Sequence, residues 1–415
     1  MAEPTNNSPK RGVLKRDSAM EQAAANNSPK RGVLKRGPFC NPGDWHGWSS
    51  SCIPPCKYVP TASPGRWPST AAQARDLLRK SAALDASTVS TLRIRSPLAD
   101  GFWVRALFVI AQAIWATLQT HRFYVQLHAG AGASCRVLRA RCANASACMT
   151  RTRCDAYFDP TSMPGADGWS EFFEPIGADA RRVSTTLELE CNAAWSLYMA
   201  GAKKDGALGI YPKSLAAARR YRQRNAEYVA QWVRVTPAVR AIADAEWRRR
   251  VPATARAVIG VHLRGTDKYV RKSFSPARYF AKVDAFLATH GEINAHIFLA
   301  TDDAGYRDEF LHRYGRARVA MQAGGELLRA TSRHTQQALG LKGGGSTHAI
   351  WKDTSGEGGY RRGLEVLLDT LLLSRCDYLL KSASAVSEFA IYFNPALINR
   401  SHDFSGPGGG GGGFT

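Results

Sequence analysis

Short apolar runs alternate with amphipathic stretches along the second half of the chain. The first of these runs is fully apolar and β-branched, as expected of a parallel strand buried on both faces. The runs are AVIGV (257–261), HIFLA (296–300), RVAM (318–321) and DYLLKS (377–382). Amphipathic helices are predicted at 275–291, 304–315, 363–376 and 385–393. This alternation predicts a doubly wound parallel sheet, in which ligands bind beyond the carboxyl ends of the strands.

Local signals mark the ends of the first of these helices. Ser275 is a suitable N-cap, and Pro276 suits the first helical position. Gly291 follows the last turn and ends the helix. One face is apolar between these ends, formed by Tyr279, Phe280, Val283, Phe286 and Leu287.

The first half of the chain shows a weaker pattern of the same kind. TLRIR (91–95) and RFYVQL (122–127) are strand-like, and an apolar helix from Gly101 lies between them. This helix carries Arg105 and Gln112, so it is predicted to be buried rather than to span a membrane. The order of strands in this part cannot be read from the pattern.

These patterns divide the 415 residues into four parts. Residues 1–60 form a disordered basic tail in which NNSPKRGVLKR occurs twice. An α/β domain is expected over 61–240, and the clearer Rossmann-like domain over 241–403. Residues 404–415 form a glycine-rich tail.

The formal charge of +22 raises polyanion binding as a possible function. Much of the excess is arginine spread along amphipathic stretches such as residues 214–235, where a solvated helix face explains it. A basic cleft for a smaller anion, such as a sugar nucleotide, would also use this charge. Charge alone indicates no specific nucleic-acid site.

The nine cysteines favour disulfides over zinc. Five of them lie within 135–191 without the paired C-x2-C spacing of zinc sites, so an oxidising compartment is expected, with free thiols as the alternative. No apolar segment of a secretory signal follows Met1. We therefore expect either a cytosolic protein or a sequence whose start is incomplete.

Polar residues follow three of the predicted strands, and these strand ends meet at one edge of a parallel sheet. His262 to Lys268 follow the first strand, Asp302 and Asp303 the second, and Ser382 and Ser384 the last. The guanidinium of Arg264 matches phosphate oxygens bidentately. Ser382 and Ser384 precede a helix, whose N-terminus attracts an anion. The chain has neither a P-loop nor G-x-G-x-x-G, so we predict a nucleotide diphosphate held by side chains.

Each of these residues has a structural alternative. Asp302 or Asp303 would cap the helix that follows, and Asp369 would be a solvated residue at the edge of a leucine stripe. His262 would be a satisfied strand-end histidine, and Arg264 would pair with Asp267.

The segments GVHLRGTDK, FLATDD and LLDTLLLSRCDYLLKSASAVSEFAIYFN resemble the nucleotide-binding half of the α1,6-fucosyltransferase superfamily. The resemblance covers residues 255 to 400, and only GWSEFFEPI and the Gly101 helix suggest it earlier in the chain. It implies two facing Rossmann-like domains of the GT-B type, GDP-fucose as donor, and inversion at the anomeric carbon without a metal or other cofactor. It also implies a glycan or glycoprotein acceptor and a secretory, Golgi-type location.

Residue roles carry over from the motifs. The resemblance implies that His262 and Asp369 bind guanine and that Arg264 and Ser384 hold the β-phosphate, with Asp302 and Asp303 matching the TDD motif. Two positions depart from the core enzymes. Gly265 stands where they have a second arginine, and Lys272 where they have the proposed catalytic glutamate.

These departures leave the general base open between Asp267 and Glu357. Arg264 and Lys268 are expected to stabilise the charge on the leaving group. The leading hypothesis is a fucosyltransferase. The alternatives are a GDP-sugar-binding protein with little or no turnover and a basic polyanion-binding protein. The acceptor, the linkage and the oligomeric state are not readable from the sequence.

Overall fold

The computed structural model describes most of the predicted helices and strands. All described residues belong to one compact unit, residues 51–415. The described ranges are 67–84, 91–94, 102–125, 127, 135–139, 150–154, 168–177, 186–188, 214–264, 276–291, 294–322, 359–382 and 384–404. Both predicted tails therefore lie outside the described residues, apart from Phe404.

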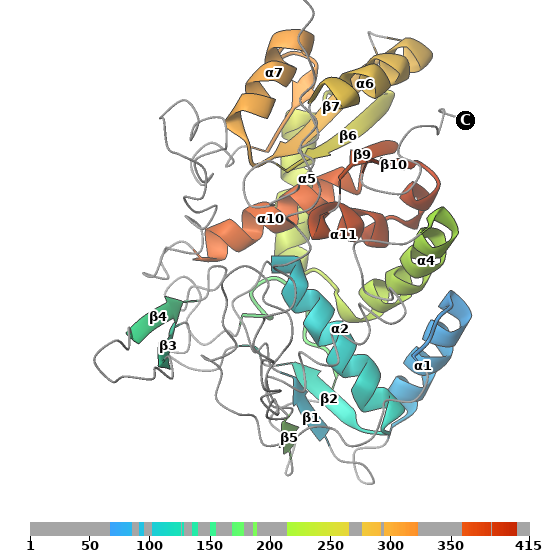
Figure 1. Ribbon diagram of the computed structural model, residues 1–415, viewed down its shortest axis with the longest axis vertical. Helices are drawn as coiled ribbons and strands as arrows, with labels where there is room; N and C mark the ends of the chain where they lie inside the picture. The colour runs from blue at the N-terminus through green and yellow to red at the C-terminus, as the bar shows by residue number, and fades with distance from the viewer. Residues whose placement is uncertain are drawn as a thin grey trace, which may run out of the picture. The chain divides into compact units, whose positions relative to one another are not determined.

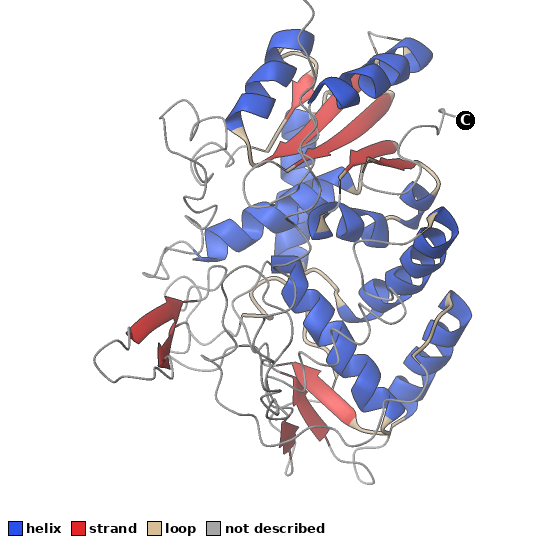
Figure 2. Cartoon of the chain, viewed as in Figure 1, coloured by secondary structure: helices blue, strands red, loops and turns tan. Residues whose placement is uncertain are grey.

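A five-stranded parallel sheet occupies the second half of the chain (Figures 1 and 2). Its order is β10-β9-β6-β7-β8, and each neighbouring pair is parallel. The strands are β6 (Ala257–Leu263), β7 (Ala295–Thr301), β8 (Val319–Ala320), β9 (Tyr378–Lys381) and β10 (Ser401–Asp403). The four predicted strands are confirmed, and β10 is an addition at the edge beside β9.

Helices cover both faces of this sheet, as the unbroken burial of β6 and β7 requires. Side chains alternate between the two faces along a strand. Ile259 and Val261 of β6 pack in one core with α6 and α7, whereas Val258 packs in another with α10 and α11. The helices are α6 (Pro276–His290), α7 (Ala304–Tyr314), α10 (Gly359–Leu373) and α11 (Ala385–Phe393).

The predicted proline and glycine signals of α6 are found at their positions, whereas Ser275, the predicted N-cap, lies outside the described residues. α6 begins at Pro276, and Gly291 follows it with a φ of +79°. Tyr279, Val283 and Phe286 of the predicted face are buried. Helix α10 differs at both ends, because it begins at Gly359, one helical turn before the predicted first residue, and ends at Leu373, before the predicted last residue Cys376.

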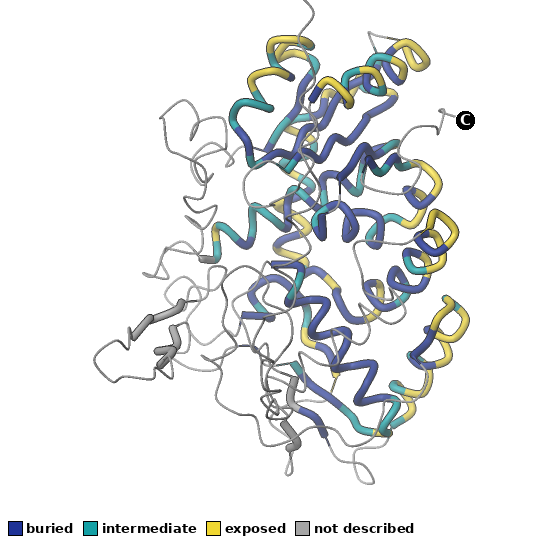
Figure 3. Tube along the Cα trace, in the orientation of Figure 1, coloured by how far each residue is buried: buried dark blue, intermediate teal, exposed yellow. Residues whose placement is uncertain are grey.

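A second parallel sheet lies in the first half of the chain, with the order β2-β1-β5. Helix α2 connects β1 to β2 and is buried along almost its whole length, as Figure 3 shows. The predicted strand, helix, strand unit is therefore confirmed. Among the described helices, none is long and apolar enough to cross a bilayer. The elements are α1 (Ala71–Ala83), β1 (Thr91–Ile94), α2 (Phe102–Leu118), β2 (Arg122–Val125) and β5 (Thr186–Glu188).

An antiparallel pair, β3 (Cys135–Arg139) and β4 (Thr150–Cys154), lies between β2 and β5 in the chain. Cys135 and Cys154 are partners in its register. The side chains of this pair lie outside the described residues, so the predicted disulfides stay a prediction.

One hydrophobic core joins elements from both halves of the chain. Trp103 of α2 stacks on Phe389 of α11, with ring centroids 4.1 Å apart, and Phe172 stacks on Tyr360 of α10 at 5.3 Å. The added Cβ of an alanine at Gly363 would lie 2.5 Å from the Phe172 ring, so α10 needs a glycine at this contact. The two parallel sheets are thus joined by shared helix packing. The predicted domain boundary near residue 240 stays a prediction.

Two further helices, α4 (Leu215–Trp232) and α5 (Pro237–Arg250), precede β6. Helix α4 packs against α1 and α11. The solvated face expected for the arginines of α4 is correct for Arg219 and Arg220 but wrong for Arg222 and Arg224, which are buried. Their partners from other parts of the chain explain the difference: Arg224 donates to the Pro68 carbonyl at 2.9 Å, and Arg222 binds carboxylates described below.

Candidate functional site

The strand order places the candidate site at the carboxyl ends of β6 and β9. From β6 the chain winds outward through β7 to β8, and it then returns to β9 on the other side of β6. Such a reversal of strand order opens a crevice beyond the carboxyl ends of the two strands, where ligands of open α/β sheets bind. Arg264 follows β6, and Ser382 and Ser384 follow β9. The predicted phosphate-binding residues therefore flank this crevice.

Arg264 lies beside a carboxylate at this edge. Its Nε lies 3.8 Å from Oδ2 of Asp302, which follows the neighbouring strand β7, and the two side chains are 26% and 29% exposed. A pair this long and this exposed contributes at most about 1 kcal/mol. This contact by itself is therefore weak. Among the described residues its acidic neighbour is Asp302, while Asp267, the predicted alternative partner, lies outside them.

Asp303 has the structural role that was the alternative for it. It is the N-cap of α7, and its Oδ1 accepts from the backbone N–H groups of Gly305 at 2.8 Å and Tyr306 at 3.3 Å. Its own N–H donates to Oγ1 of Thr301 at 3.2 Å. The structure therefore separates the two adjacent aspartates, because Asp303 fixes a helix and Asp302 faces Arg264.

The turn from β9 into α11 carries a buried hydroxyl. Ser384 is the N-cap of α11 and is fully buried, yet its side chain makes no capping bond. Its Oγ has no hydrogen-bond partner in the described part of the chain. A buried polar atom without a partner costs free energy, which a ligand oxygen can recover. The hydroxyl and the positive end of the helix thus offer an anion two attractive groups at one point.

His262 lies in β6 on the sheet face that α10 and α11 cover. Val258 and Gly260 share its face of the strand. Val258 packs in the core with α10 and α11, and Gly260 lies beside Leu373 of α10 and Cys376. His262 is buried, and its register partner in β9 is Lys381. Its position agrees with the predicted contact to a base, although a buried strand histidine fits it equally.

Asp369 lies on α10, over this same face of the sheet. It is partly buried, and Leu367 and Leu368 beside it are in the core. The next residue, Thr370, accepts a 2.7 Å hydrogen bond from Nε1 of Trp103 in α2. Asp369 therefore sits at the rim of the core on a helix that a second element fixes. His262 and Asp369, predicted to bind guanine together, belong to one face of the sheet.

Several predicted residues lie outside the described ranges. They are Asp267 and Lys268, predicted for catalysis, and Glu357, the other candidate base. Their roles stay predictions. No three His, Cys, Asp or Glu side chains gather as a metal site in the ranges that the structure describes.

A buried cluster of four charged residues next to the turn was not predicted. Lys381 ends β9, Glu388 lies in the first turn of α11, Asp403 ends β10, and Arg222 comes from α4. Lys381 Nζ lies 2.6 Å from Asp403 Oδ2 and 2.9 Å from Glu388 Oε1. Arg222 binds Glu388 with two hydrogen bonds, of 3.0 Å and 2.8 Å, and lies 3.4 Å from Asp403. We call these four residues the charge cluster.

The cluster keeps its charges although it is buried. Burial by itself raises the pKa of Glu388, but the positive charges of Lys381 and Arg222 outweigh it and lower this pKa to about 2. Burial also opposes the charge of Arg222, yet Glu388 and Asp403 raise its pKa. Two positive and two negative groups leave the cluster close to neutral. The sequence signal was a charged residue inside each of two apolar segments, YLLK and AVSEFAIYF.

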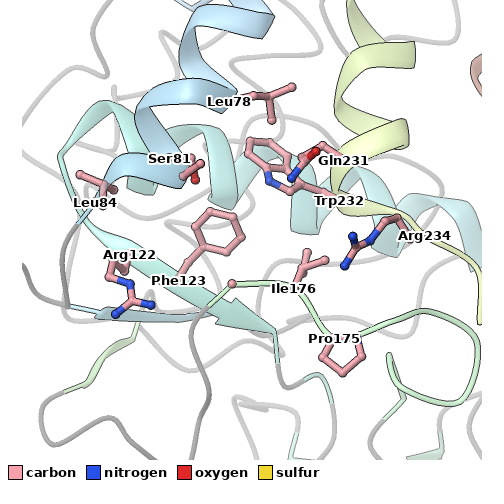
Figure 4. A pocket seen from close by; sticks show the side chains of 12 residues that line it. Leu78, Ser81, Leu84, Arg122, Phe123, Pro175, Ile176, Gln231, Trp232 and Arg234 are labelled. Carbon is pink, nitrogen blue, oxygen red and sulfur yellow. The ribbon is translucent and has the colours of Figure 1, made fainter.

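A pocket of about 290 Å³ lies elsewhere, around the first residues of β2 (Figure 4). It is at the amino end of that parallel strand, and it contains none of the predicted site residues. Its lining residues are Leu78, Ser81, Ala82, Leu84, Arg122, Phe123, Pro175, Ile176, Gly177, Gln231, Trp232 and Arg234. The pocket is thus separate from the candidate site.

Solved structures similar to this chain are fucosyltransferases. Fucosyltransferase NodZ from Bradyrhizobium is 14% identical, with 76% of this chain and 96% of the other covered and a TM-score of 0.35. A NodZ alpha-1,6-fucosyltransferase soaked with GDP-fucose is 14% identical, with coverages of 74% and 94% and a TM-score of 0.33. A mutant of Arabidopsis thaliana FUT1 in complex with GDP is 11% identical, with coverages of 85% and 80% and a TM-score of 0.36.

No family model matches the chain, and no curated protein matches it. These solved structures are fucosyltransferases, the class of enzyme that the motifs of residues 255 to 400 resemble. At TM-scores of 0.33 to 0.36 the similarity assigns neither a substrate nor a residue role. Both have to be argued from the site itself.

Proposed function

We propose that this protein is a GDP-fucose-dependent fucosyltransferase of the GT-B type. The observation that carries the proposal is the crevice between β6 and β9, with Arg264 on one side and the buried Ser384 hydroxyl at the N-terminus of α11 on the other. A fork-shaped cation opposite a helix N-terminus suits a diphosphate. The similar structures include one soaked with GDP-fucose and one co-crystallised with GDP, which supports this choice of donor.

The guanine base of the donor is assigned to the side of the crevice that α10 covers. His262 and Asp369 belong to the face of the sheet that α10 covers, beside the diphosphate residues. A carboxylate accepts two hydrogen bonds, and guanine presents the adjacent donors N1–H and N2–H, whereas adenine presents no such pair. Asp369 is therefore the residue that selects GDP.

The transfer is a direct displacement with inversion. The acceptor hydroxyl oxygen forms a bond to the anomeric carbon of fucose as the bond from that carbon to the β-phosphate oxygen of GDP breaks. The bonding electrons pass to this phosphate oxygen, whose negative charge Arg264 and Lys268 stabilise. The hydroxyl proton passes to a base, for which Asp267 and Glu357 are the candidates. The acceptor is a glycan or glycoprotein.

No divalent metal is required in this proposal. Metal-dependent transferases use a bound cation to neutralise the leaving diphosphate. Here Arg264 and the N-terminus of α11 supply positive charge at the crevice, and Lys268, which lies outside the described residues, is expected to add to it. Asp303, one of the two adjacent aspartates, is committed to capping α7.

A nucleotide screen followed by an activity assay tests the proposal. The purified chain is mixed with GDP, ADP, UDP and GDP-fucose, and its thermal unfolding is recorded. GDP and GDP-fucose should raise the Tm, and ADP and UDP should not. GDP-fucose is then supplied with glycan acceptors, and release of GDP is measured. Stabilisation by GDP without any release of GDP from GDP-fucose would instead identify a binding protein, and stabilisation by no nucleotide would overturn the proposal.

A further inference from the structure

The turn between β9 and α11 is bounded on both sides by members of the charge cluster. Lys381 is the last residue before the turn, and Glu388 lies one helical turn after it. The 2.9 Å contact between Lys381 Nζ and Glu388 Oε1 therefore joins the two sides of the turn that carries Ser382 and Ser384. The Ser387 hydroxyl also bridges this turn, because its Oγ donates to the carbonyl of Ser382 at 3.3 Å and to that of Ser384 at 3.2 Å.

Arg222 completes this arrangement from outside the sheet. It binds both carboxylate oxygens of Glu388, so the orientation of that carboxylate, and not only its charge, depends on the guanidinium. It lies 3.4 Å from Asp403, the partner of Lys381. Removal of Arg222 would take away a cation that lies within 3.4 Å of both buried carboxylates.

The charge of Glu388 would otherwise disfavour an anion at this helix end. A carboxylate in the first turn of α11 cancels part of the positive end of the helix dipole for a nearby phosphate. With Lys381 and Arg222 against it, Glu388 contributes no net negative charge there. Arg222 thus acts on the turn in two ways, because it fixes the carboxylate and compensates its charge.

We infer that Arg222 is a positioning residue for the donor diphosphate, acting through Glu388 and Lys381 on the turn that presents Ser384. The inference rests on the proposed function. It assigns a role in donor binding to α4. This helix precedes all five strands of the sheet in the chain and is not adjacent in sequence to β6 or β9. By thermodynamic linkage, a donor that binds the ordered turn also strengthens the attachment of α4.

A second contact between the same two helices provides a matched control. Asn225 Nδ2 of α4 donates to Oη of Tyr392 of α11 at 3.1 Å, and both residues are buried. Tyr392 is in the last turn of α11, at the opposite end from Ser384. Tyr392→Phe therefore removes a hydrogen bond between α4 and α11 but keeps both hydrogen bonds from Arg222 to Glu388.

The test compares Arg222→Lys with Tyr392→Phe. Lysine keeps the charge but cannot bind both oxygens of Glu388 in a planar fork. We expect Arg222→Lys to raise the Kd of GDP, measured by calorimetry, by about fivefold or more. Tyr392→Phe should leave it within about twofold, a difference too small to count as coupling. The KM for GDP-fucose should rise in parallel in Arg222→Lys while kcat changes little.

The outcomes separate this inference from the proposed function. If the unaltered protein binds no GDP, both fall. If it binds GDP and Arg222→Lys binds GDP equally well, or if the two variants lose affinity alike, only the positioning role of Arg222 falls.

A measurement on the unaltered protein covers the case in which Arg222→Lys does not fold. Hydrogen exchange of backbone amides is followed with and without GDP. GDP should slow exchange in α4 around Arg222 more than in α1, which packs on α4 and has no member of the charge cluster. Equal protection of the two helices would overturn the inference.

Discussion

Trp103 Nε1 donates a 2.7 Å buried hydrogen bond to Oγ1 of Thr370, which joins α2 to α10 across 267 positions of the chain. Thr370 adjoins Asp369, the residue proposed to select guanine. The position of this carboxylate over the sheet therefore depends on packing contributed by the first half of the chain.

Thr370→Val should lower the free energy of unfolding by about 1–3 kcal/mol, because it leaves the indole N–H of Trp103 buried without a partner. Urea unfolding measures the change. Thr117→Val is the matched control, since Thr117 is also buried and helical, and its hydroxyl donates to the carbonyl four residues earlier, as that of Thr370 does. Equal losses in the two variants would show that the bond from Trp103 contributes nothing.

Arg264→Ala should weaken GDP binding by about tenfold to a hundredfold, the loss expected for a charge-assisted bidentate contact worth about 1.5–3 kcal/mol. Calorimetry with GDP measures it. Arg256→Ala controls for general attraction, because Arg256 is exposed just before β6, at the opposite edge of the sheet. An unchanged GDP affinity in Arg264→Ala removes the phosphate contact from the proposal.

Asp369→Asn should abolish most of the preference for GDP over ADP while the protein stays folded. Asparagine has nearly the same volume as aspartate. Its amide offers an acceptor oxygen and a donor NH2 group, whereas the two N–H donors of guanine require two acceptors. The ratio of the two affinities is the quantity to compare. Glu365→Gln, one turn earlier on α10, should leave this ratio unchanged. If Asp369→Asn leaves the ratio of GDP to ADP affinity unchanged, Asp369 does not contact the base.

Chelation of divalent metals should leave transfer from GDP-fucose intact, because Arg264, Lys268 and the N-terminus of α11 neutralise the leaving diphosphate. The rate is measured before and after EDTA treatment, and again after addition of manganese or magnesium. Loss of the rate with EDTA and its return with either metal would contradict this expectation.

The charge cluster should make stability depend on pH in the acidic range. The pKa of Glu388 is lowered from 4.5 to about 2, so its contribution is complete above pH 4.5 and is lost as the pH falls toward 2. The loss amounts to about 3 kcal/mol. The unfolding free energy of the unaltered protein and of Glu388→Gln should therefore converge over this interval. If the two curves of unfolding free energy against pH stay parallel, Lys381 and Arg222 do not stabilise the charged form of Glu388.

The sheet that carries the site was predictable because its signals are local. β6 is an apolar run, α6 has its proline and glycine at the expected ends, and the residues after each strand are polar. The reversal of strand order between β8 and β9 was not readable from one strand at a time, since it depends on which strands become neighbours. The edge strand β10 has only three residues and gave no pattern of its own.

Candidate site residues could be named from the sequence, and their roles stay predictions, whereas the contacts that support them could not be read from it. Asp303 fits both a helix cap and a ligand contact in sequence, and only the bonds to Gly305 and Tyr306 decide for the cap. Arg222 stands among other arginines of α4, and its partner Glu388 lies 166 positions away. No sequence spacing marks such a pair, because its geometry exists only after α4 and α11 have packed.

The packing of Trp103 on Phe389 and of Phe172 on Tyr360 has a consequence for dividing the chain. A fragment that began near residue 241 would contain every strand of the five-stranded sheet, yet it would expose the aromatic and leucine side chains that α10 and α11 now share with α2. The complementary fragment would leave the other side of the same contacts in water. Each piece would therefore lack part of its core, so a chimaera that joins the second half of the chain to a foreign partner should include α2.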